Sequence, residues 1–102
     1  MRKRGRFNTA FRERYFALVN GSIYYYESES AYYQGVRSKG KLNVQGAVVR
    51  ASTGFDLKAG FEWTVSEAES ERELACACGS EESREEWLDA IEREGGVIAE
   101  FD

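Results

Sequence analysis

Alternating apolar and polar positions over residues 11–29 predict a β-hairpin. The runs 11–19 (FRERYFALV) and 22–29 (SIYYYESE) flank Asn20-Gly21. Both residues of this pair tolerate the left-handed backbone that a two-residue type I′ turn requires. The polar stretch from Ser28 to Ser38 then predicts a loop.

Short strand-like runs continue on both sides of this hairpin. A first strand is expected over residues 2–7. After the loop, four further strands are expected over residues 40–44, 47–52, 61–67 and 72–79. Residues 53–60 are ambiguous.

Near the C-terminus the spacing of apolar residues changes from strand-like alternation to a helical period, which predicts one amphipathic helix. Ser80 is a suitable N-cap, and the acidic residues that follow it favour the positive end of the helix dipole. An apolar stripe marks the buried face: Trp87, Leu88, Ile91 and Ala90. Gly95-Gly96 is expected to end the helix.

Seven short strands followed by one helix indicate a mainly β fold. We expect a seven-stranded bent antiparallel sheet, or partly open barrel, capped by the C-terminal helix. The 102 residues suffice for one domain, which we place at residues 2–94, with residues 95–102 as a C-terminal tail. The chain shows neither a secretory signal nor about 18 consecutive apolar residues. The chain is therefore expected to be cytoplasmic. As an isolated domain we expect it to be a monomer.

Charge is distributed unevenly along the chain. Residues 1–41 hold nine basic and three acidic residues, a balance of +6, whereas residues 42–102 hold five basic and fifteen acidic residues, a balance of −10. Such a separation would orient the molecule toward a negatively charged surface. An uneven but purely solvated surface is the alternative.

The residue types needed for catalysis or metal binding are missing. The chain has no histidine and no GxxxxGK[ST] phosphate-binding motif. Cys76 and Cys78 alone cannot complete a zinc site, and a disulfide between them would be badly strained. We therefore expect no enzyme, no metal and no cofactor, and we interpret both cysteines as thiols of a strand.

The order of elements, together with several local motifs, resembles the pleckstrin-homology (PH) domain. The resemblance covers about residues 2–94. The motifs that carry it are KRG at residues 3–5, FRERYFAL followed by SIYYY, SKGKLNV, and EEWLDAI, in which Trp87 occupies the position of the family's nearly constant tryptophan. The resemblance implies a PH-like fold and a membrane-targeting module that recognises phosphoinositide or other anionic phospholipid headgroups.

One part of the sequence is similar to the basic signature of phosphoinositide-binding PH domains. Lys3 is followed after eight residues by Arg12-Glu13-Arg14 and then a hydrophobic pattern. The family also uses a tyrosine on its third strand and often a basic residue before its fourth. The resemblance therefore implies this headgroup site: Lys3, Arg12, Arg14, Tyr25 and Lys39.

The strand pattern agrees with this assignment. Because side chains alternate along a strand, Arg12 and Arg14 share a face with Phe16 of the presumed core. Arginines could face inward only at an open mouth, where they reach solvent and an anion, since burial of an unpaired guanidinium would be very costly. We also expect Arg6 and Phe7, in the loop beside this mouth, to contact the membrane.

Alternatives remain at the level of the residues and of the function. Arg12 and Arg14 could instead pair with the neighbouring Glu13, or with Glu27 and Glu29 across the hairpin. The domain could bind a protein partner without significant lipid affinity, because a fold alone does not determine a function. A nucleic-acid partner is not expected, since the single basic end fits a membrane surface better.

Overall fold

The computed structural model describes residues 1–4, 11–56 and 60–99. Among these residues, the strands form a six-stranded sheet in the order β2-β1-β8-β7-β6-β9 and a three-stranded sheet in the order β3-β4-β5. The elements in chain order are β1 (Arg2–Arg4), β2 (Phe11–Glu13), β3 (Tyr15–Val19), β4 (Ser22–Tyr26), α1 (Glu29–Tyr33), β5 (Gly40–Asn43), β6 (Val48–Asp56), β7 (Gly60–Ser66), β8 (Glu73–Cys78), α2 (Glu81–Arg93) and β9 (Val97–Ile98).

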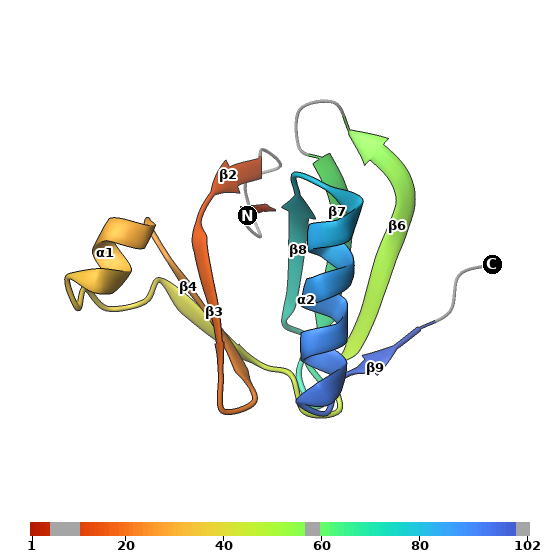
Figure 1. Cartoon of the computed structure of the whole chain (residues 1–102). Helices are drawn as coiled ribbons and strands as arrows, with labels where there is room; N and C mark the ends of the chain where they lie inside the picture. The colour runs from red at the N-terminus through yellow and green to blue at the C-terminus, as the bar shows by residue number, and fades with distance from the viewer. Residues whose placement is uncertain (5–10, 57–59, 100–102) are drawn as a thin grey trace.

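This arrangement confirms the mainly β fold with a helix near its C-terminus. The sheets are antiparallel apart from the pairing of β9 with β6, which is parallel. Figure 1 shows the three-stranded sheet on one side, the larger sheet on the other, and α2 lying in front of β7 and β8. The barrel is open, since the two sheets are separate.

The predicted strand over residues 11–19 is divided at Arg14. β2 precedes Arg14 and pairs with β1 in the larger sheet, whereas β3 follows it and pairs with β4 in the smaller one. The chain thus passes from one sheet to the other at Arg14. The Arg14 backbone N–H donates to the Met1 carbonyl at 2.8 Å, which ties this corner to the start of the chain.

The hairpin turn is confirmed. Asn20 and Gly21 both have positive φ angles, 49° and 76°, as a type I′ turn requires. The turn sets the register in which Phe16 pairs with Tyr25.

The prediction of a loop over residues 28–38 was wrong for its first half, which contains α1. The Ser28 hydroxyl accepts a hydrogen bond from the Ala31 N–H at 3.0 Å and caps the helix. Gly35, with φ of 77°, lies just past its C-terminal end. A helix of five residues is too short to show a 3.6-residue hydrophobic period, so its signals were confined to the two caps.

Two other segments extend the predicted elements. β6 continues through Asp56, into the stretch that was ambiguous in sequence. Val97 and Ile98, which we assigned to the C-terminal tail, form β9 beside Val48 and Val49 of β6.

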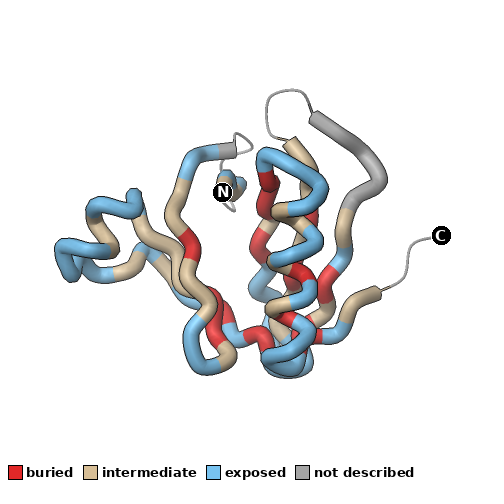
Figure 2. Tube along the Cα trace, in the orientation of Figure 1, coloured by how far each residue is buried: buried red, intermediate tan, exposed pale blue. Residues whose placement is uncertain are grey.

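The core lies between the two sheets and α2 (Figure 2). Trp63 is fully buried, and Trp87 packs at the margin of the core. Both cysteines are free and buried, and burial raises the pKa of Cys76. In the part of the chain that the structure describes, no helix is long and apolar enough to cross a membrane.

The C-terminal helix forms as predicted. The Ser80 hydroxyl accepts a hydrogen bond from the Ser83 N–H at 3.0 Å, and Leu88 and Ile91 are buried. At the other end, the Gly96 N–H donates to the Ile91 carbonyl at 2.9 Å. This bond belongs to a glycine-dependent C-cap.

Candidate functional site

Lys3 and Tyr25 face each other from the two sheets. Lys3 pairs with Cys76 of β8, and directly opposed residues of antiparallel strands project to the same face. Because Cys76 is fully buried, Lys3 projects inward at the end of the core. Its Nζ lies 4.6 Å from the centroid of the Tyr25 ring, within the range of a cation–π contact.

Gly40 makes room for the Tyr25 ring. A Cβ atom at Gly40 would overlap the ring and hydroxyl of Tyr25, so only glycine leaves space for this arrangement. The adjacent Lys39 N–H donates to the Tyr25 carbonyl at 2.8 Å. The pairing of β4 with β5 thus positions Tyr25 and Lys39 together.

Lys3 lies within electrostatic range of three other cations. Burial lowers the pKa of Lys3 below its ordinary value, and the positive charges of Arg14, Arg72 and Lys39 lower it further. The four residues come from four separate parts of the chain. Their mutual repulsion would be relieved by a bound anion.

None of these four cations forms an ion pair with a carboxylate in the part of the chain that the structure describes. Among the described residues, no carboxylate oxygen lies within 4.0 Å of the charged nitrogens of Lys3, Arg14, Lys39 or Arg72. Arg14 instead donates from Nη1 to the Glu13 backbone carbonyl at 2.7 Å. Among the described residues, neither Arg12 nor Arg14 forms an ion pair with Glu13, Glu27 or Glu29, so the alternative in which these carboxylates neutralise the two arginines is not observed there.

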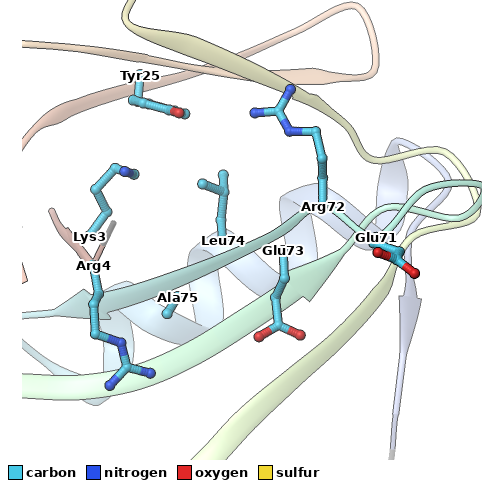
Figure 3. A pocket seen from close by; sticks show the side chains of 8 residues that line it. All are labelled: Lys3, Arg4, Tyr25, Glu71, Arg72, Glu73, Leu74 and Ala75. Carbon is cyan, nitrogen blue, oxygen red and sulfur yellow. The ribbon is translucent and has the colours of Figure 1, made fainter. Parts of the chain in front are cut away.

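A pocket of about 590 Å³ opens beside Lys3 and Tyr25. In Figure 3, Lys3, Arg72 and Leu74 point to the side on which Tyr25 lies, whereas Arg4, Ala75 and Glu73 point away from it. Glu71 completes the lining. The pocket lining thus combines basic residues with Glu71 and Glu73, which belong to the acidic sequence SEAESERE at residues 66–73.

The other predicted site residues lie farther out or beyond the described residues. Arg12 is opposite Lys3 in the pairing of β1 with β2. It therefore shares the face of Lys3, but its side chain is exposed. Arg6 and Phe7, the expected membrane contacts, lie outside the described residues.

Sequence reasoning missed Arg72. The signal was available, because Arg72 precedes Leu74 and Cys76 at alternate positions, in the same way as Arg14 precedes Phe16. Both buried residues indicate that this face points to the core. Arg72 was overlooked because the glutamates around it make the segment appear uniformly acidic.

Comparisons with known proteins agree with this fold. A family model, the PH domain, matches residues 1–95. A search of curated proteins finds no match. Among solved structures, human FAM129B/MINERVA/NIBAN2 is similar with a TM-score of 0.79 and 14% identity, over 92% of this chain and 20% of that one. This chain thus spans about a fifth of that protein's length.

Two isolated PH domains are also similar. The PH domain of human oxysterol binding protein-related protein 11 has a TM-score of 0.68 and 24% identity, covering 91% of this chain and 73% of that one. The C-terminal PH domain of pleckstrin, solved with D-myo-Ins(1,2,3,4,5)P5, has a TM-score of 0.69 and 19% identity, covering 92% and 90%. At these identities the structures establish the fold alone, whereas the family model covers nearly the whole sequence. The chain therefore belongs to the PH domain family.

Proposed function

We propose that this PH domain binds the headgroups of anionic phospholipids, and phosphoinositides in particular, through the pocket beside Lys3 and Tyr25. The observation that carries the proposal is that Arg14, Lys39 and Arg72 lie within electrostatic range of Lys3, and that none of these four cations forms an ion pair among the described residues. PH domains are generally non-catalytic binding modules. The inositol pentakisphosphate bound by the C-terminal PH domain of pleckstrin supports a ligand of this chemical class.

Each residue would have a distinct part in binding. The planar guanidinium groups of Arg14 and Arg72 can donate paired hydrogen bonds to phosphate oxygens, whereas Lys3 and Lys39 act as compact charges. Tyr25 would hold Lys3 in place through its ring and could donate its hydroxyl to the ligand. Arg12 would contact the ligand from the rim.

Membrane attachment would follow from headgroup binding. We propose a cytoplasmic domain that associates peripherally with an anionic membrane. Arg6 and Phe7 are proposed as additional contacts, with Arg6 meeting headgroups and Phe7 entering the interfacial region.

A protein-interaction module is the second candidate function. Glu71 and Glu73 line the same pocket as Lys3 and Arg72. Carboxylates there would oppose a highly charged headgroup, and they would suit a partner surface that carries both signs of charge.

Arg14→Ala tests the lipid-binding proposal. Loss of a charge-assisted contact to phosphate should cost about 2–3 kcal/mol, roughly a 30- to 150-fold loss of affinity for phosphoinositide vesicles. The variant should remain stable, because Arg14 is only partly buried and its removal relieves repulsion with Lys3. Vesicle sedimentation measures the affinity, and circular dichroism checks the fold.

Arg50→Ala is the matched control, since Arg50 is an exposed arginine on β6. It should bind almost as the parent does. If folded Arg14→Ala binds phosphoinositide vesicles with unchanged affinity, lipid binding through this pocket is wrong and the protein-interaction function becomes the better proposal.

A further inference from the structure

The segment from α1 to the start of β5 exposes apolar groups. All residues of α1 are described, and none is buried. Tyr33 is 73% exposed and Val36 is 50% exposed. Among the described residues only Val19 and Val97 are comparable exposed large hydrophobics, so two of the four lie within this one short segment.

Hydrogen bonds at both ends hold this segment in a defined conformation. Ser28 caps the start of α1. At the other end, the Val36 N–H donates to the Ala31 carbonyl at 3.0 Å and the Gly35 N–H donates to the Tyr32 carbonyl at 3.2 Å. This pair of bonds is a Schellman motif, which requires the positive φ of Gly35. Val36 is thus fixed directly after the helix.

A cluster of tyrosine rings supports the exposed side chains. The Tyr32 ring lies 5.0 Å from the Tyr15 ring, 5.0 Å from the Tyr26 ring and 5.1 Å from the Tyr33 ring, measured between centroids. α1 therefore packs on tyrosine side chains of β3 and β4. Tyr33 is thus an exposed residue on a helix that is packed against the sheet.

The exposed apolar groups adjoin positive charge. Residues 29–41 contain three basic residues, Arg37, Lys39 and Lys41, and one acidic residue, Glu29 at the start of α1. The Lys39 N–H bonds to the Tyr25 carbonyl, so the segment runs directly into the proposed headgroup site. In Figure 1, α1 and the turn after it project from the edge of the molecule.

We propose that α1 and the turn after it form a second membrane contact, in which Tyr33 and Val36 enter the interfacial region of an anionic bilayer. Tyrosine suits this region because its ring is apolar and its hydroxyl is polar. The neighbouring basic side chains would remain among the anionic headgroups. The inference rests on the proposed function, because the pocket must bring the domain to the membrane first.

The test compares a membrane ligand with a soluble one. Tyr33→Ser combined with Val36→Ser should weaken binding to phosphatidylcholine vesicles containing phosphatidylserine and a phosphoinositide by about tenfold, because apolar burial at the bilayer is lost. Binding of inositol hexakisphosphate, measured by calorimetry, should be unchanged, since that molecule reaches only the pocket.

The matched control removes equally exposed apolar groups elsewhere. Val19→Ser combined with Val97→Ser changes residues that are 44% and 55% exposed, at the hairpin tip and on β9. This variant should bind both ligands as the parent does. An equal loss of vesicle binding in this variant would show that exposed apolar groups matter wherever they lie on the surface, and it would overturn the inference.

A fluorescent probe measures insertion directly. Tryptophan emission of Val36→Trp should shift to shorter wavelength when vesicles are added, relative to the parent with its own Trp63 and Trp87. Val97→Trp should show no such shift. Absence of a shift for Val36→Trp with vesicle-bound protein would overturn the inference.

The outcomes separate this inference from the proposed function. If the parent binds inositol hexakisphosphate and vesicles, and the α1 double variant binds both equally well, only the second membrane contact is wrong and the exposed segment suits a protein partner instead. If the parent binds neither ligand, the proposed function is wrong and this inference fails with it.

Discussion

At the scale of the residue, the site depends on a glycine. Gly40 lies against the Tyr25 ring and has no side chain that could displace it. The ring in turn contacts the Lys3 ammonium group. Gly40 is not itself a proposed ligand contact, but it determines the positions of two residues that are, Tyr25 and Lys3.

Gly40→Ala should displace the Tyr25 ring and weaken inositol hexakisphosphate binding. We expect a loss of about three- to tenfold, because the contact between Lys3 and the ring disappears while the four charges remain. Calorimetry gives the affinity, and ring signals in the NMR spectrum report the movement of Tyr25. Gly79→Ala is the control, since a Cβ atom there would meet only open space. Unchanged affinity of Gly40→Ala would show that the ring position does not matter.

At the scale of the element, α2 is specified by its ends and by one buried face. Ser80 caps its first turn, and Leu88 and Ile91 pack into the core between the sheets. Its exposed face is acidic: Glu81, Glu82, Glu85, Glu86, Asp89 and Glu92. The helix therefore closes the core on one side and presents negative charge on the other.

Ser80→Ala should lower the free energy of unfolding by about 1 kcal/mol, because the Ser83 N–H loses its hydrogen-bond acceptor. Urea denaturation measures the change. Ser80→Asp keeps an acceptor at the N-cap and should recover most of the stability. Equal destabilisation by alanine and aspartate would rule out the capping explanation.

At the scale of the whole molecule, charge separation along the chain would orient the domain. The +6 segment contains three of the four cations of the candidate site, Lys3, Arg14 and Lys39, and the −10 segment contains the acidic face of α2. Arg72 is the exception, since it belongs to the acidic half of the sequence but lines the same pocket as Lys3. The long-range field would attract an anionic surface to the basic end and repel it from α2.

Vesicle binding should therefore weaken as salt is added. Screening shortens to about 8 Å near physiological ionic strength, so we expect affinity for phosphoinositide vesicles to fall at least about tenfold between about 0.05 and about 0.5 M salt. Sedimentation at several salt concentrations measures this fall, and vesicles of phosphatidylcholine alone should not bind. Salt-independent binding to neutral vesicles would contradict the electrostatic account.

The sequence by itself determined the features that depend on neighbouring residues. Asn20-Gly21 specified the hairpin turn, and Ser80 with Gly95-Gly96 specified the ends of α2, because turns and caps are made by residues a few positions apart. Alternation placed Arg14 on the face of Phe16 for the same reason. The resemblance to PH domains supplied the order in which these elements combine.

Only the tertiary structure decided which distant residues meet. It placed Arg72 and Lys3 in the lining of one pocket and packed the Tyr25 ring against Gly40. It also turned the chain from one sheet to the other at Arg14 and packed α1 on a tyrosine cluster. These arrangements depend on sheet pairing between segments far apart in sequence, and no local pattern encodes which partner a strand will find. The composition of the pocket therefore became visible only once the two sheets were in place.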